Sequence, residues 1–207
     1  MKYLSKINRG AILTAVVVLA VICYLVTTAI LQNNEKPRIK QICETYLVQE
    51  VAYNMLPTTY RVDKPDMPVT VLNDYLAEMK KNIIAFYPTN EQYYKFVIDT
   101  RTADLTNQAK GNGIVFQYTK TITKYNEMIF NGDMVNVTFT TSTTLEAKDL
   151  YGSGSTIKEK ITSDVDDNII LQKIGGSWKV VYATINRPAS NDYIDKMGIA
   201  ATQNGKY

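Results

Sequence analysis

The chain has 207 residues, of which 45% are hydrophobic and 21% are charged, a composition typical of a folded protein and not of a disordered one. Its formal charge of +3 comes from three basic residues before residue 10, so the rest of the chain is electrically neutral. A neutral domain lacks the positive surface that sequence-independent nucleic-acid binding needs, so no nucleic-acid partner is expected. The chain also contains no histidine, the side chain best suited to proton transfer near neutral pH.

The first predicted element is a membrane anchor at residues 11–31. These 21 residues contain no charge, glycine or proline, and a helix rising about 1.5 Å per residue would let them span a hydrocarbon core of roughly 30 Å. The run is longer than the apolar core of a cleaved signal peptide, and no clear small-residue cleavage site follows it, so an uncleaved signal-anchor is predicted. Lys2, Lys6 and Arg9 favour a cytoplasmic tail at residues 1–10, with a single-pass anchor in the cell membrane and the remainder outside.

Two amphipathic helices are expected next, joined by a link with three prolines at residues 56–68. The apolar stripe of the first helix begins after Pro37 and consists of Ile39, Ile42, Cys43, Tyr46, Leu47, Val51 and Met55. The stripe of the second consists of Leu72, Tyr75, Leu76, Met79, Ile83 and Phe86, and Pro88 ends it. Cys43 is expected to be a small buried hydrophobe. Residues 91–100 are ambiguous between a short helix and a strand.

From Gly111 onward the apolar period changes from about 3.6 residues to 2, which predicts β-strands. Residues 134–145 alternate most clearly, and Asn131-Gly132 before them is a strong hairpin signal that pairs them with residues 113–130. Residues 149–156 (DLYGSGST) are expected to be a flexible connection. The acidic cluster at residues 164–168 (DVDDN) lacks the spacing of a calcium loop, so a solvated bend between strand segments is preferred to a cation site.

The last hairpin is predicted to turn at Gly175-Gly176, because glycine adopts the positive dihedral angles that a tight turn requires. A final strand follows and ends before Pro188. Trp178, Val180 and Tyr182 fall on one face of this strand and are predicted to belong to the structural core.

The other face of the final strand is also apolar, with Val181, Ala183 and Ile185. Two apolar faces indicate either a strand covered on both sides or one face kept for a partner. Tyr93 and Tyr94 add a second candidate patch, since tyrosine-rich surfaces favour protein contacts. These five residues are the candidate interface.

Together these elements predict an α+β protein, in which a transmembrane helix precedes a cone-shaped domain of two or three helices packed on a curved antiparallel sheet. The domain is expected at residues 33–188, and residues 189–207 are expected to form a flexible tail.

The hairpins NGDMVNVTF and IILQKIGGSWKVV resemble the nuclear-transport-factor-two-like cone, and the resemblance covers residues 36–188. A short tail, one membrane helix and one outward domain of this kind are similar to the VirB-eight family of assembly proteins of type IV secretion and conjugation machines. That resemblance implies a structural subunit that contacts itself and other channel proteins, and it carries over no site residue.

No catalytic, cofactor-binding or metal-binding residue is predicted, and the chain is expected not to be an enzyme. The sequence contains no glycine-rich phosphate loop, Cys/His metal spacing or nucleophile motif. Asp99 with Tyr93, Tyr94 or Tyr118 could imitate the acid–tyrosine pair of an isomerase, but in a chain with 15 tyrosines such pairs arise by chance.

Two functions therefore stay open. One is an assembly or interaction subunit of an envelope machine, which an exposed apolar face or groove would favour. The other is an anchored extracytoplasmic module that binds a small ligand or acts as a sensor. A deep pocket that combines apolar walls with a few convergent polar groups would favour this second function.

Overall fold

The computed structural model describes the backbone of residues 9–149 and 158–188. Its elements are α1 (Arg9–Ala52), the 3-10 helix η2 (Thr58–Tyr60), α2 (Val69–Ile84), the 3-10 helix η3 (Glu91–Tyr93), α3 (Lys95–Ala109), β1 (Ile114–Asn131), β2 (Met134–Lys148), β3 (Lys158–Ile174) and β4 (Ser177–Thr184). The chain divides into two compact units, residues 1–41 and residues 42–207. The predicted α+β class is confirmed.

The first unit consists of the N-terminal part of α1. This part is long and apolar enough to cross a membrane, and within the described residues its most apolar stretch is not buried in the protein.

The helix continues through Pro37 without a break, whereas the sequence predicts a new helix there. A proline removes one backbone hydrogen bond, here to the carbonyl of Asn33. The adjoining turn, NNEK, is polar, so water can satisfy that carbonyl and the helix persists.

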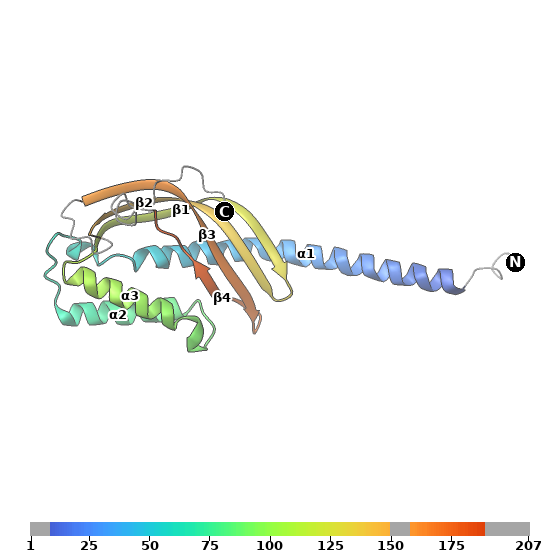
Figure 1. Ribbon diagram of the computed structural model, residues 1–207. Coiled ribbons are helices and arrows are strands. Elements are labelled where there is room, and N and C mark those ends of the chain that lie inside the picture. Colours follow the sequence, from blue (N-terminus) through green and yellow to red (C-terminus); the bar gives the residue numbers. More distant parts are fainter. Residues whose placement is uncertain (1–8, 150–157, 189–207) are drawn as a thin grey trace, which may run out of the picture. The chain divides into compact units, whose positions relative to one another are not determined.

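The second unit is built on an antiparallel sheet of four strands in the order β1-β2-β3-β4. Side chains along β2 alternate strictly between buried and partly exposed, so one face of the sheet is core and the other faces water. Figure 1 shows a curved sheet with residues 42–52 of α1, α2 and α3 on its concave side. Met55, just after α1, packs there against Tyr118 and Leu145 of the sheet.

β1 contains three β-bulges, which contribute to this curvature. The register between β1 and β2 shifts between Val115 and Gln117, between Ile122 and Lys124, and between Tyr125 and Glu127. Each extra residue bends the strand and increases its twist. Because β1 is an edge strand, the bulges also disfavour its pairing with a strand of another chain.

The predicted hairpin turns are present, and glycine conformations explain both. Gly132, between β1 and β2, has φ 61°, while Gly175 and Gly176, between β3 and β4, have φ 57° and 80°. These left-handed conformations cost little only for glycine. Of the predicted connection at residues 149–156, all but Asp149 lies outside the described residues.

The prediction of a bend at residues 164–168 is wrong. β3 runs through the acidic cluster without a break, in continuous register with β2. Asp164 and Asp166 point to the solvent-facing side of the sheet, whereas Asp167 is buried on the other side. A strand tolerates this cluster because its alternation separates neighbouring carboxylates onto opposite faces.

The core prediction for β4 holds at two of its three positions. Trp178 and Val180 are 6% and 0% exposed. In the helical layer Cys43 is also buried, as predicted, and burial raises the pKa of its thiol to about 12, which makes it an unreactive group.

Tyr182, in contrast, is 56% exposed, so its assignment to the core is wrong. The cause is a β-bulge: Leu171 pairs with Val180 and Ile170 with Tyr182, which leaves Val181 as an extra residue. Since Ile170 and Leu171 point to opposite faces of β3, their partners Tyr182 and Val180 must do so as well. The bulge therefore turns Tyr182 outward and Ala183 inward.

Candidate functional site

A buried ion pair joins α1 to α3. It is formed by Oε1 of Glu50 and Nη2 of Arg101, whose side chains are 5% and 13% exposed. Burial works to lower the pKa of Arg101, but the carboxylates of Glu50 and Asp104 outweigh it and raise that pKa, so the guanidinium stays charged. Charges are buried in this way only when a partner compensates them.

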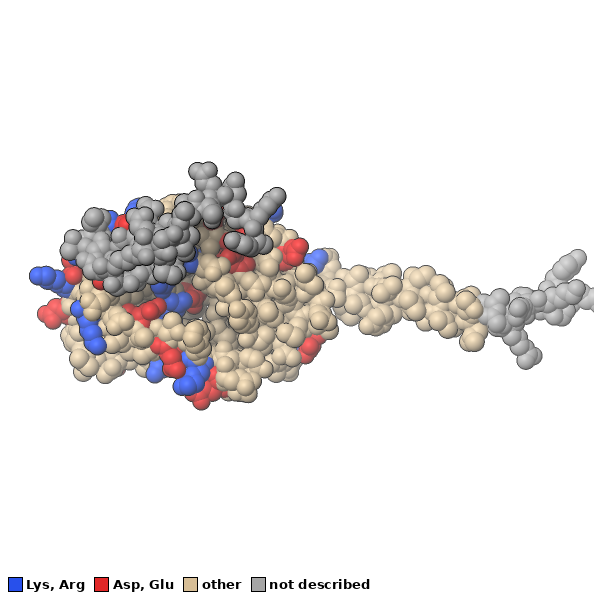
Figure 2. Space-filling model, in the orientation of Figure 1, with Lys and Arg blue, Asp and Glu red and all other residues tan. Residues whose placement is uncertain are grey.

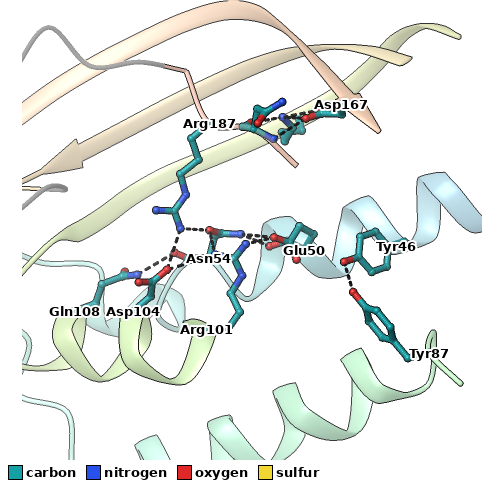
Figure 3. A network of polar contacts seen from close by, with 11 residues as sticks. Tyr46, Glu50, Asn54, Tyr87, Arg101, Asp104, Gln108, Asp167 and Arg187 are labelled. Atoms are coloured by element: carbon teal, nitrogen blue, oxygen red, sulfur yellow. Dashed lines mark hydrogen bonds and ion pairs between the residues drawn. The ribbon is translucent and has the colours of Figure 1, made fainter. Parts of the chain in front are cut away.

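Asn54 extends the ion pair into a larger polar cluster (Figure 3). Its Oδ1 accepts hydrogen bonds from Nη1 of Arg101, at 2.7 Å, and from Nη2 of Arg187. Oδ2 of Asp104 lies 3.4 Å from Nη1 of Arg101 and 3.3 Å from Nη2 of Arg187. Gln108 donates from Nε2 to the backbone oxygen of Asn54 at 3.0 Å. Two arginines thus face two carboxylates, and the cluster as a whole is neutral.

A second ion pair connects β1 to β3 and holds the segment that carries Arg187. Nζ of Lys120 lies 2.8 Å from Oδ2 of Asp167, and both side chains are 0% exposed. Thr141 donates to the same oxygen of Asp167 at 2.7 Å. The backbone N–H of Asn186 donates to Oδ1 of Asp167 at 2.8 Å, and its carbonyl accepts from Lys120 at 2.7 Å. Held through both backbone groups of Asn186, the chain after β4 presents Arg187 to the polar cluster.

A cleft of about 240 Å³ lies between the first half of α3 and the end of β4. One wall is formed by Phe96 and Val97 and the other by Ala183 and Ile185, and the remaining lining residues are Tyr46, Glu50, Thr100, Arg101 and Thr184. Phe96 is 79% exposed, although it is a large apolar side chain. The cleft therefore combines apolar walls with a buried ion pair.

Tyr46, which lines the cleft, is held in place by Tyr87. The hydroxyls of Tyr46 and Tyr87 are hydrogen-bonded at 2.7 Å (Figure 3), and their rings make an edge-to-face contact. Burial raises the pKa of both phenols, that of Tyr87 to about 12, so both remain protonated at neutral pH. This pair fixes the ring of Tyr46 where it lines the cleft.

A smaller cavity of about 130 Å³ lies on the other side of the polar cluster. Its lining residues are Asp104, Asn107, Gln108, Asn112, Gly113, Asp149 and Arg187. Because the lining is polar, this cavity suits water better than an apolar group.

The structure brings together only part of the predicted interface. Ala183 and Ile185 line the cleft. Val181 is the extra residue of the bulge. Tyr93 ends η3 and Tyr94 follows it, just before α3, and both are half-buried and outside the lining of the cleft.

Sequence reasoning missed the charged part of the site. Glu50 falls on the apolar stripe of its helix, four residues after Tyr46 and three after Leu47. A carboxylate at such a position is a signal of a buried ion pair. Arg101 offered no such signal, because residues 91–100 were ambiguous between a helix and a strand and no element was predicted for the ten residues that follow them.

The structure also shows where the acid of the isomerase-like combination lies and how the charges are distributed. Asp99, the acid of the isomerase-like combination, is exposed and pairs with Lys95 at 3.3 Å. Within residues 9–149 and 158–188, no three Asp, Glu, Cys or His side chains are grouped closely enough to hold a metal ion. On the face drawn in Figure 2, acidic and basic side chains are interspersed over the domain.

Comparison with known proteins adds no identification. No protein-family model matches the chain, and no curated protein matches it in sequence. The functional assignment therefore rests on the cleft and the polar cluster.

Proposed function

We propose that this chain is a membrane-anchored, non-enzymatic interaction subunit of a cell-envelope machine, and that it docks a partner protein in the cleft between α3 and β4. The observation that carries the proposal is the exposure of Phe96, at 79%, on a cleft whose walls include Val97 and Ile185. A large exposed aromatic residue beside an apolar groove is typical of protein–protein interfaces.

The charges and dimensions of the cleft support a protein segment over a metabolite. Its ionic groups compensate one another, so an ionic ligand gains no net attraction. Its volume of about 240 Å³ lies below the roughly 300–1,000 Å³ of most small-molecule sites.

The sheet edges are poor sites for strand addition, which favours docking in the cleft. The bulges of β1 disrupt one edge. On the other edge, the N–H of Val180 donates to the carbonyl of Phe86 at 2.8 Å, and Lys179 donates to the carbonyl of Ala85. A partner that cannot extend the sheet must use a surface formed by side chains.

The anchor strengthens an interface of this size. Confinement to a membrane raises the effective concentration of neighbouring proteins, so weak contacts suffice. We take the domain to be a nuclear-transport-factor-two-like cone, with the N-terminus in the cytoplasm and the domain outside. On the resemblance to the VirB-eight family, the proposed machine is a conjugation or type IV secretion channel, with further copies of this chain and other channel proteins as partners.

One experiment tests the site in the native membrane. A photo-crosslinking amino acid is placed at Ile185 in the full-length chain and, as the matched control, at Tyr182 on the outer face of the same strand segment. Discrete crosslinked protein species are expected from position 185 and not from 182. Discrete products from 182 alone would transfer the interface to the outer face of the sheet.

The second candidate function is an anchored small-ligand or sensor module, and one observation favours it. The lining of the cleft combines apolar residues with the charged residues Glu50 and Arg101. The absence of crosslinks from both positions, together with a co-purifying small molecule, would establish this function in place of the first.

The orientation has its own test. Protease added to intact cells should digest the region from residue 33 onward and leave the N-terminus protected. A domain digested only after lysis would reverse the proposed topology.

A further inference from the structure

Two atoms of the Glu50–Arg101 ion pair have unused hydrogen-bonding capacity. Nε of Arg101 is buried and has no acceptor among the described residues. The contacts of the Glu50 carboxylate with Arg101 and Asn54 both use Oε1, so Oε2 remains available as an acceptor. Buried polar atoms are almost always paired, and an unpaired one calls for a bound group or water.

A donor and an acceptor left open together specify a chemical group. A hydroxyl can donate to Oε2 of Glu50 and accept from Nε of Arg101. A carboxylate can only accept and an ammonium can only donate, and either would add an uncompensated charge to a neutral cluster. The polar part of the cleft therefore favours a neutral hydroxyl.

The walls of the cleft specify what carries that hydroxyl. Phe96 and Val97 of α3 line the cleft together with Ala183 and Ile185, and Tyr46 adds a further aromatic residue to the lining. A volume of about 240 Å³ accommodates an aromatic side chain, and tyrosine combines an apolar ring with a polar tip and is enriched at interfaces.

We propose that the cleft is an anchor pocket for a tyrosine side chain of a partner protein. The ring lies between α3 and β4, and the phenol donates to Glu50 and accepts from Arg101. Nε of Arg101 is buried in the free protein. The side chains that cover it must therefore change rotamer before the phenol can reach it, and such changes are common at interfaces. The inference rests on the proposed function, since it assumes that a protein enters the cleft.

The test compares two probes that differ by one hydroxyl, N-acetyl-tyrosinamide and N-acetyl-phenylalaninamide. Each is titrated into the full-length chain in lipid nanodiscs, and the methyl NMR signals of Val97 and Ile185 are followed. The tyrosine probe is expected to shift both signals, and the phenylalanine probe to bind at least about 10-fold more weakly, because it leaves both polar atoms unpaired.

Variants locate the effect. Ala183→Leu, which fills the cleft, should abolish binding, whereas Tyr182→Leu, on the opposite face, should not change it. Arg101→Lys keeps the charge and removes Nε, so it should reduce the ratio of tyrosine-probe to phenylalanine-probe affinity toward one. Trp178 fluorescence checks folding, and if a variant does not fold, the ratio of the two probes on the unmodified chain still decides.

Each outcome bears on one proposal. Equal binding of the two probes, or no shift from either at its solubility limit, would overturn the tyrosine pocket. Crosslinks from position 185 without a tyrosine preference would leave the docking function standing and remove only this inference. A co-purified small molecule that the tyrosine probe cannot displace from the cleft would also overturn the tyrosine pocket.

Discussion

Among the described residues, the ion pairs Lys120–Asp167 and Glu50–Arg101 differ in how completely their buried polar atoms are hydrogen-bonded. The first is closed, with its buried atoms paired, and the second is open. The side chains of Lys120 and Asp167 are 0% exposed, and Thr141 and the backbone of Asn186 supply further hydrogen bonds. The pair of Glu50 and Arg101 instead borders a cleft, and one buried nitrogen of Arg101 is unpaired among the described residues.

Under the proposed function, this difference separates a structural role from a binding role. A closed pair with its partners in place fixes the chain that it holds, here the segment after β4. An incompletely satisfied pair at a cleft retains hydrogen-bonding capacity for another molecule. The predictions below test that distinction.

The largest effect is expected from breaking the closed pair. Lys120→Met leaves Asp167 buried without a counter-charge, which should lower the free energy of unfolding by about 3–5 kcal/mol. Urea denaturation of the full-length chain in detergent measures this change. The matched control, Lys120→Met with Asp167→Asn, removes the uncompensated charge and keeps an acceptor oxygen for the partners of Asp167, so it should recover part of the loss. A single variant as stable as the unmodified chain would show that the pair is not buried.

A smaller effect is expected from the open pair. Arg101→Met leaves Glu50 beside the cleft, where water can reach its carboxylate, so the loss in unfolding free energy should be about 1–3 kcal/mol. The same denaturation series gives the value. A loss larger than that of Lys120→Met would reverse the comparison and make the helix cluster the more closed of the two.

The pH dependence of stability should reflect the buried thiol and phenol groups of the domain. Burial raises the pKa values of Cys43 and Tyr87 to about 12, while the unfolded chain releases these protons near pH 8.5 and 10. The folded state therefore holds more protons, so stability is fully present below about pH 8.5 and falls as the pH rises toward 12. Burial lowers the pKa of Lys120, which opposes this loss, but Tyr46 and Tyr75 add to it.

Denaturation midpoints at pH 7.5, 9 and 10.5 test the sign. Tyr87→Phe removes one titrating group from the folded core and should make the decline shallower. A midpoint that rises with pH would show that Lys120 dominates over the buried acids.

The smallest effect is expected on the outer face of β4. Tyr182→Ala should change stability by no more than about 0.5 kcal/mol, as for other exposed sites. Trp178→Ala, four residues earlier and buried, should cost about 3–5 kcal/mol. Similar losses for the two variants would contradict the assignment of the bulge at Val181.

The sequence predicted most of the fold where local signals suffice. Alternating residues defined β2, the glycines at 132 and 175–176 defined the turns, and the apolar stripes defined the helical faces. Tyr182 was misplaced because a bulge depends on pairing with β3, and alternation within one strand does not reveal it. Asp167 was misread because its partner, Lys120, is distant in sequence. Of the site, Ala183 and Ile185 were predicted and Arg101 was not, since tertiary packing alone places it beside Glu50.

The most direct test of the central claim compares two neighbouring residues of β4 in the cell. Ala183→Leu fills the cleft and Tyr182→Leu changes only the outer face, and the size of the complex containing each variant is measured by native electrophoresis after mild extraction from membranes. The account predicts that Ala183→Leu releases the protein into a smaller species while Tyr182→Leu leaves the complex intact. A complex that is lost with Tyr182→Leu and retained with Ala183→Leu would contradict it.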